Sequence, residues 1–563
     1  MTASASVQIE VTVSGVSDPL LKNVLARLTI LLHKDNERLQ AGAVRRMHRQ
    51  ANEDISSALA PFGYYNPRVV SSLSKKDGVW HAQYTIDKGP PVIVRDVSLQ
   101  LAGDGADNAP LLAALADFPV KDGDILNQEL YEQGKKKLVN QAFSEGFIDA
   151  AFSERTLRIS PGDNSASIRL VLGTGRQYRF GETSSSQKIL RQDLLKRYQP
   201  YKAGDPYNPA KLFELQSILY QTDYFSRVAV RGQLDNARDF AIPVDIDLTA
   251  PEHLNKYSFG VGYATDTGVR GKIDWDNRLF NTHGHQVNAS LQLAERENTI
   301  AFHYKMPMNE DPRYHSLTGS LAYQDKNWEN TTTQLFTAAL TRAYVEPRYK
   351  LSTGIELRDE IYDIGDTSGE STLLLPSLNG GLIFADDLLN TKNGLQASIG
   401  LIGGVEGVIS DASFLQATLS GKAILSPMQD WRIIGRGAAG ITAVDSIDSL
   451  PPSLRFYTGG DNTIRGYKYK SIGTKDSSGE TIGGKYMIVG GIEIERIIYN
   501  KWSLAAFWDG GTATDDLSLN FYQGVGGGVR FRLPFGQIRL DVASAITEDG
   551  NPLRIHLMVG ADL

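Results

Sequence analysis

The 563-residue sequence contains no cysteine. This absence excludes a disulfide framework, a thiolate zinc site and a cysteine nucleophile. Long hydrophobic runs are also missing, because no stretch reaches the ~18 consecutive apolar residues of a typical transmembrane helix. We therefore expect either a soluble protein or one that crosses a membrane as a β-barrel, whose signal per strand is much weaker. The first ten residues lack the basic start and apolar core of a secretory signal, so we expect a mature chain.

An excess of positive charge is absent as well. The sequence has 58 lysines and arginines against 65 aspartates and glutamates, a net charge of −7. Nucleic acid is therefore not expected as the main partner, because its binding usually needs a basic face. No Gly-x-Ser-x-Gly or His-Glu-x-x-His motif occurs, and the glycine-rich residues 524–528 lead into a strand pattern rather than a helix. We expect no enzymatic activity, no cofactor and no metal site.

Composition divides the chain near residue 254. Of the 54 glycines, 16 lie in residues 1–254 and 38 in residues 255–563. In the first half, a turn followed by aromatic residues and a strand pattern recurs about every 80 residues, at 63–69, 146–152 and 223–228. The pattern predicts three repeat domains, although unrelated α+β domains could share this turn chemistry. The predicted domains are residues 1–89, 90–175 and 176–253.

Each repeat is predicted to run strand, helix, helix, strand, strand. In the first repeat, alternating apolar residues predict strands at 7–13, 67–73 and 79–87. Helical spacing predicts helices at 18–33 and 42–60. Gly63 and Gly146 suit the left-handed turn that ends a helix, whereas Asp223 in the third repeat suits it less well. Asn127 and Asn208 are predicted helix N-caps.

The second half, residues 254–563, contains about sixteen candidate strands of ~10 residues, the length of a membrane-crossing strand. Clear examples are 257–263, 286–293, 318–323 and 335–341. In the last segment, 553–563, aliphatic residues on one face alternate with Arg554, His556, Met558, Gly560 and Asp562 on the other. This period of two favours an all-β barrel with a lipid face and a polar lumen face. A soluble β-sandwich or propeller gives a similar pattern.

One inter-strand segment, residues 444–485, is too long for an ordinary hairpin loop. It contains Gly-Gly-Asp-Asn-Thr-Ile-Arg-Gly-Tyr at 459–467, and later strands carry Gly-Gly-Ile-Glu at 490–493 and Phe-Trp-Asp-Gly-Gly at 507–511. Following repeats of ~80 residues, these motifs resemble the BamA/TamA superfamily of outer-membrane assembly barrels with POTRA domains. Three repeats and the sequence of residues 459–473 are most similar to its TamA-like members.

The resemblance implies that the long loop folds back into the barrel lumen. Arg465 would then pair with Glu493 and Asp509, since a guanidinium in a confined lumen needs carboxylate partners. Gly466 would let the backbone approach the wall, and Tyr467 would add an aromatic contact with a hydroxyl group. The alternative is an exposed turn with an ordinary surface arginine. The predicted loop site comprises Arg465, Gly466, Tyr467, Glu493, Phe507, Asp509 and Gly511.

The resemblance also implies a lateral seam where the first strand, about 256–264, meets the last, about 553–563. Opening it would expose a strand edge, which is a template for a client's strand. The predicted seam residues are Tyr257, Phe259, Gly260, Val261, Gly262, Ile555, Leu557, Val559 and Gly560.

The implied function is the insertion or secretion of outer-membrane proteins, especially autotransporters. The implied location is the Gram-negative outer membrane, with residues 1–253 in the periplasm. The implied partners are a TamB-like inner-membrane-anchored periplasmic protein, client outer-membrane proteins and the lipid bilayer. The alternative functions are a passive porin-like channel and a two-partner secretion pore, each with periplasmic binding domains.

Overall fold

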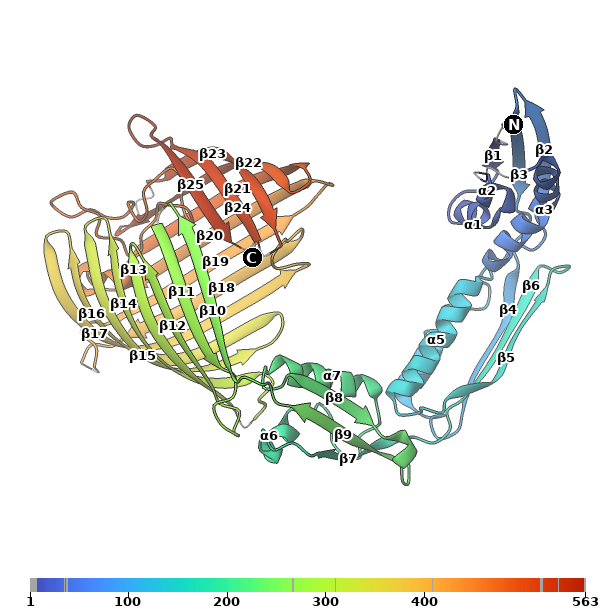
Figure 1. Cartoon of the computed structure of the whole chain (residues 1–563), viewed down its shortest axis with the longest axis horizontal. Helices are drawn as coiled ribbons and strands as arrows, with labels where there is room; N and C mark the ends of the chain where they lie inside the picture. Colours follow the sequence, from blue (N-terminus) through green and yellow to red (C-terminus); the bar gives the residue numbers. More distant parts are fainter. Residues whose placement is uncertain are drawn as a thin grey trace, which may run out of the picture. The chain divides into compact units, whose positions relative to one another are not determined.

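The computed structural model describes residues 8–34, 36, 39–265, 268–308, 310–407, 409–516, 520–534 and 536–560. Three small sheets precede one large sheet along the chain (Figure 1). Contacts group the chain into two compact units, namely Met1–Ser186 with Pro200–Gln216 and Ala229–Asp247, and Gln187–Gln199 with Ser217–Val228 and Leu248–Leu563. The domain boundaries predicted from the sequence, at residues 89, 175 and 253, are not tested by this division and stay predictions. No helix in the described ranges is long and apolar enough to cross a membrane.

The three small sheets share one topology. In each, the first strand pairs in parallel with the last strand, as β1 does with β3. The elements are β1 (Ile9–Ser14), α1 (Leu20–Arg27), α2 (Thr29–Leu32), α3 (Ala41–Leu59), η1 (Ala60–Phe62), β2 (Arg68–Lys76) and β3 (Val79–Asp87); β4 (Ile93–Ala102), α4 (Ala109–Ala116), α5 (Gln128–Ser144), β5 (Ala151–Ser160) and β6 (Ser165–Gly173); and β7 (Arg179–Ser185), α6 (Gln192–Arg197), α7 (Pro209–Gln221), β8 (Arg227–Gly232), η2 (Leu234–Asn236) and β9 (Ala241–Thr249). The predicted order of strand, two helices and two strands is confirmed in all three. In the first repeat, the helix predicted over 18–33 is divided into α1 and α2. Val7, predicted to begin the first strand, lies outside the described residues.

Turn chemistry explains where these elements begin and end. The Asn127 side chain accepts hydrogen bonds from the backbone N–H of Glu129 at 2.9 Å and of Leu130 at 3.2 Å, so it caps α5 as predicted. Gly63 and Gly146 both adopt φ +88°, the left-handed conformation that glycine adopts without strain. Asp223 occupies the same turn in the third repeat with φ +63°.

The second half forms a single sheet of sixteen strands in sequence order, and consecutive strands are antiparallel. This arrangement confirms the predicted antiparallel barrel. β14 to β17 contain 14 to 19 residues and are longer than the expected ~10. The strands are β10 (Asn255–Ala264), β11 (Gly268–Asn277), β12 (Gln286–Ala294), β13 (Glu297–Pro307), β14 (His315–Trp328), β15 (Thr331–Val345), β16 (Tyr349–Ile364), β17 (Thr367–Ala385), β18 (Gly394–Gly404), β19 (Phe414–Leu425), β20 (Trp431–Ala443), β21 (Tyr486–Tyr499), β22 (Trp502–Thr514), β23 (Tyr522–Leu533), β24 (Gly536–Ala545) and β25 (Leu553–Gly560).

The two faces of the barrel sheet differ in character. On β25, Leu553 is 73% exposed and Ile555 is 63% exposed, whereas His556 is 2% exposed. The apolar outer face and polar inner face therefore follow the predicted alternation over the described part of this strand. Residues 561–563 lie outside the described residues.

The sheet's two end strands, β10 and β25, approach each other but are not joined by a backbone ladder in the described part of the chain. Within the described residues, the seam therefore lacks the backbone pairing that joins every other pair of neighbouring strands in this sheet. A side chain makes the connection instead, because the Leu557 N–H donates to the Thr265 hydroxyl at 3.2 Å. The barrel is thus nearly closed, with its weakest join between its first and last strands.

Candidate functional site

The segment between β20 and β21, residues 444–485, lies against the inner face of the barrel sheet. It begins with two short turns, η3 (Ile447–Ser449) and η4 (Pro452–Leu454). Leu450 and Leu454 pack in one buried cluster with inward-facing residues of β17 and β19, namely Leu373, Leu375 and Phe414. The Ser453 N–H donates to Glu360 on β16 at 3.2 Å. The loop is therefore packed into the lumen along its first part.

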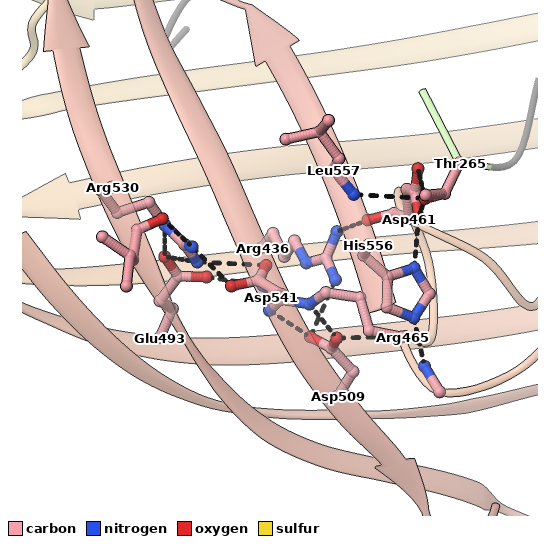
Figure 2. A network of polar contacts seen from close by, with 12 residues as sticks. Thr265, Arg436, Asp461, Arg465, Glu493, Asp509, Arg530, Asp541, His556 and Leu557 are labelled. Atoms are coloured by element: carbon pink, nitrogen blue, oxygen red, sulfur yellow. Dashed lines mark hydrogen bonds and ion pairs between the residues drawn. The ribbon is translucent and has the colours of Figure 1, made fainter. Parts of the chain in front are cut away.

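Arg465 meets three carboxylates, which lie on β21, β22 and β24 (Figure 2). Its Nε and Nη2 donate to Asp509 on β22 at 2.7 and 3.1 Å, a two-pronged contact that a planar guanidinium makes well. Its Nη1 donates to Glu493 on β21 at 2.8 Å and to Asp541 on β24 at 3.0 Å. The contacts to Asp509 and Glu493 are those that the resemblance implies, while Asp541 was not foreseen.

Two further arginines complete this group, which we call the arginine cluster and which comprises Arg436, Arg465, Glu493, Asp509, Arg530 and Asp541. Arg530 on β23 donates to Glu493 at 2.8 Å and to Asp541 at 3.2 Å. Arg436 on β20 lies 2.8 Å from Asp509. Three cations therefore face three carboxylates, and the formal charges cancel.

Burial makes the arginine cluster sensitive to the loss of any member. Asp509, Arg530 and Asp541 are fully buried. Buried ion pairs add little net stability, because desolvation offsets most of their attraction, but removing one partner costs about 3–5 kcal/mol. The arrangement therefore fixes the position of the loop tip on the wall formed by β20 to β24 more than it raises stability.

The remaining predicted loop residues surround Arg465. The guanidinium carbon of Arg465 lies 3.3 Å from the centroid of the Phe507 ring, a cation–π stack. The Tyr467 hydroxyl contacts the Thr547 hydroxyl at 2.6 Å, and its ring is buried. Gly511 lies further along β22, opposite Val489, and belongs to the wall itself.

Two glycines let the loop backbone approach the sheet. Gly466 adopts φ +97°, and a Cβ there would lie 2.9 Å from the backbone nitrogen of Ala545 on β24. On the sheet side, a Cβ at Gly524 would fall 1.9 Å from the carbonyl oxygen of Arg465. Side chains larger than hydrogen at either position would push the loop off the wall. The sequence predicts the close approach at Gly466. It does not predict the one at Gly524, which stands out in the sequence only as part of the glycine-rich residues 524–528.

A second anchor holds the loop to the other side of the barrel. The Lys470 ammonium lies 3.8 Å from the ring centroid of Trp328 on β14 and 5.2 Å from that of Tyr457. β22, which carries Asp509, is eight strands on from β14 in the sixteen-strand sheet. In a nearly closed barrel these strands are on opposite sides, so the loop spans the lumen.

The predicted seam residues fall on the two end strands. Tyr257, Phe259 and Val261 of β10 point to the outer face, and Val261 is 95% exposed. On β25, Ile555 and Val559 are exposed on the same face. Gly260 and Gly262 alternate with the outward residues of β10, and Gly560 ends β25. Among these residues, Leu557 makes a polar contact across the seam, to the Thr265 hydroxyl.

Sequence reasoning missed Asp541, Arg530 and Arg436, although strand alternation carries a signal for them. Asp541 lies between the outward-facing Leu540 and Val542, so its carboxylate must point inward, where a buried charge needs a partner. A second buried group supports this logic, because Glu495 on β21 pairs with Arg432 at 2.8 Å and with Arg532 at 3.0 Å.

Comparison with known proteins identifies relatives of both halves. Residues 280–562 match the Omp85 superfamily domain, and residues 10–88 match the first POTRA domain of TamA. The outer membrane protein assembly factor BamA of Neorickettsia risticii is 22% identical over 398 residues, 65% of this chain and 52% of that protein. BamA of Nitratidesulfovibrio vulgaris is 24% identical over 496 residues, 83% of this chain and 61% of that protein.

A solved structure shows the same fold. The crystal structure of BamA from Haemophilus ducreyi lacking POTRA domains 1–3 superposes with a TM-score of 0.67 at 15% identity, covering 83% of this chain and 99% of that one. The chain spans 52% and 61% of the length of the two BamA relatives. Because the matched superfamily domain covers half of the sequence and includes the arginine cluster, the chain belongs to the Omp85 superfamily.

Proposed function

We propose that this chain is an outer-membrane assembly barrel that inserts or secretes outer-membrane proteins, especially autotransporters, through the seam between β10 and β25. The observation that carries the proposal is that, in the described residues, no backbone hydrogen-bond ladder joins the end strands β10 and β25. An unpaired strand edge is a template on which another chain can add a strand. The relatives from N. risticii and N. vulgaris are named outer membrane protein assembly factors, which supports the same class of function here.

The apolar outer face and polar lumen support a location in the Gram-negative outer membrane, with residues 1–253 in the periplasm. Backbone groups in lipid must be paired, so a sheet there closes almost everywhere and can open only where pairing is weak. The described end strands offer one such place. The arginine cluster then serves as a structural and gating device rather than as a catalytic centre.

The small sheets support a periplasmic partner. In the first sheet, β2 is an edge strand, and Val70 on it is 74% exposed. An exposed edge with an apolar side chain suits strand addition by an extended segment of another protein. We infer that a TamB-like, inner-membrane-anchored periplasmic protein binds this region.

A loop that spans the lumen argues against a passive channel. Its anchors at Arg465 and Lys470 lie on opposite sides of the barrel. We expect planar-bilayer recordings of the purified protein to show no large, steady conductance. Such a conductance would favour the porin-like alternative.

The register at the seam allows a direct test. Sixteen strands alternate in direction, so β25 runs antiparallel to β10. If an antiparallel ladder continued from the contact of the Leu557 N–H with the Thr265 hydroxyl, Val559 would lie opposite Tyr263 and Gly560 opposite Gly262. Both Tyr263 and Val559 are exposed on the outer face, as opposite residues in one ladder should be.

Cysteines placed at Gly262 and Gly560 would be the only two in the chain, since the sequence has none. With the seam oxidised, we expect insertion of an autotransporter client to stop, and reduction to restore it. The two single-cysteine variants serve as controls for damage by the substitutions. Full crosslinking with unchanged client insertion would overturn lateral insertion.

A further inference from the structure

Asp461, four residues before Arg465, touches both ends of the barrel sheet (Figure 2). Its carboxylate accepts a short hydrogen bond from Nδ1 of His556 on β25. It also lies 3.4 Å from the hydroxyl of Thr265, the residue directly after β10. The Thr265 hydroxyl in turn accepts the Leu557 N–H of β25 at 3.2 Å.

We propose that Asp461 is a clasp residue that holds the seam from inside the lumen, with Thr265 and His556 as its two partners. In the described part of the sheet no ladder joins β10 to β25, so these side-chain contacts connect the edges in its place. Asp461 is 2% exposed, so its hydrogen bonds are shielded from water and are not readily exchanged for solvent. The consequence for clients rests on the proposed function, but the clasp itself does not.

The hydrogen bonds fix the ring of His556 in one tautomer. Its Nε2 accepts the backbone N–H of Gly466 at 2.9 Å, so the ring proton must be on Nδ1, where it donates to Asp461. His556 thus receives one hydrogen bond from the loop and returns another to it. Both ring nitrogens of this β25 residue are used to hold residues 461–466.

Asp461 of the clasp and Arg465 of the arginine cluster belong to one hydrogen-bonded turn. Within it, the Gly460 N–H donates to the Ile464 carbonyl at 3.1 Å, and the Thr463 N–H donates to the Gly460 carbonyl at 3.2 Å. Arg436 of the arginine cluster also donates to the carbonyls of Asp461 at 3.4 Å and Thr463 at 3.0 Å. A shift of Arg465 from its carboxylates therefore moves Asp461 as well, which couples the loop to the seam.

The test measures seam closure without any client. The Gly262 and Gly560 cysteine pair is placed in the full chain in lipid vesicles, and the rate of disulfide formation under mild oxidation is compared among variants. We expect Asp461→Asn and Thr265→Val each to slow it by about tenfold, the factor that corresponds to losing a hydrogen bond to a charged group. Thr265→Ser keeps the hydroxyl and should retain the parent rate.

Matched controls separate the clasp from general damage. Asp476→Asn changes an aspartate of the same loop whose carboxylate accepts hydrogen bonds from the nearby Ser478 and Glu480. Thr353→Val changes an exposed threonine of β16, far from the seam in sheet order. Both controls should crosslink at the parent rate. An unchanged or faster rate in Thr265→Val, with folded gel mobility retained, would overturn the clasp.

The outcome is separable from that of the proposed function. If the clasp variants slow crosslinking while a fully crosslinked seam still inserts clients, the clasp stands and lateral insertion fails. If crosslinking stops insertion but the clasp variants crosslink at the parent rate, lateral insertion stands and the clasp fails.

Discussion

Arg465 donates to both carboxylate oxygens of Asp509, with Nε 2.7 Å from Oδ2 and Nη2 3.1 Å from Oδ1. The two residues are 44 positions apart, one on the lumen loop and one on a wall strand. The contact therefore fixes the loop in one position and one orientation, since two parallel hydrogen bonds also set the plane of the guanidinium. A single point charge would set only a distance.

The first prediction concerns this two-pronged contact. Arg465→Ala should lower the free energy of unfolding by about 3–5 kcal/mol, because it leaves buried carboxylates without their central cation. Arg465→Lys keeps the charge but cannot form the fork, so we expect an intermediate loss. The measurement is the denaturant concentration at which the folded, heat-modifiable gel mobility disappears. Equal midpoints for the parent and both variants would refute the role of Arg465.

A second prediction concerns Asp541, which lies outside the recognised motif. Asp541→Asn removes a charge that faces Arg465 at 3.0 Å and Arg530 at 3.2 Å, and it leaves the arginine cluster with a net positive charge. We expect a loss of roughly 2–5 kcal/mol, within the range for charged groups in buried networks. Asp549→Asn, an exposed residue of the turn after β24, is the matched control. If both variants unfold at the parent midpoint, Asp541 does not contribute to the stability of the arginine cluster.

Local patterns predicted the secondary-structure elements and the two faces of the sheet, whereas the choice of a barrel over a soluble sandwich or propeller also needed the resemblance. Side chains on a strand alternate, so the contrast between Ile555 and His556 already separates the two barrel faces in the sequence. Turn residues act within a few positions, which is why Asn127 could be recognised as a cap and Gly63 as a helix end. These features depend on neighbours in the chain and need no knowledge of distant partners.

The site was predicted only where a motif linked distant residues. Arg465, Glu493 and Asp509 were expected together because the resemblance implies it, and they lie within hydrogen-bonding distance. Asp461 and His556 are 95 positions apart, and neither the spacing nor the alternation of a strand indicates which inward residue meets the loop. That β10 and β25 lack a ladder within the described residues was also unpredictable, since the sequence of β10 satisfies strand periodicity whether or not it is paired.

The third prediction tests how closely the loop must approach the wall. In Gly524→Ala the added methyl would lie 1.9 Å from the Arg465 carbonyl oxygen, so the loop tip or β23 must move. Overpacking of this kind costs about 1–3 kcal/mol or more, and we expect weaker folding and a lower unfolding midpoint. Gly435→Ala on β20 is the control, because a methyl there meets no atom within 4 Å. Identical behaviour of the two variants would contradict the close approach.

The fourth prediction concerns pH and the first small sheet. His48 on α3 is half-buried, and its Nδ1 lies 3.0 Å from the Tyr84 hydroxyl. Burial lowers the pKa of His48 below its ordinary value of 6.5. The unfolded chain therefore binds the proton more readily than the folded chain, and stability is lost as the pH falls from 6.5 to the folded pKa.

Trp80 reports on this region, because it is buried in the first sheet and the other five tryptophans of the chain all lie beyond residue 254. The measurement is the urea midpoint of the first tryptophan fluorescence transition, at urea concentrations where gel mobility shows that the barrel is still folded. We expect this midpoint to be lower at pH 5 than at pH 7.5. In His48→Gln this difference should shrink, because the titrating ring is gone. His33→Gln, which changes an exposed histidine of the same domain, should keep the full difference. An undiminished pH dependence in His48→Gln would assign the effect to other groups.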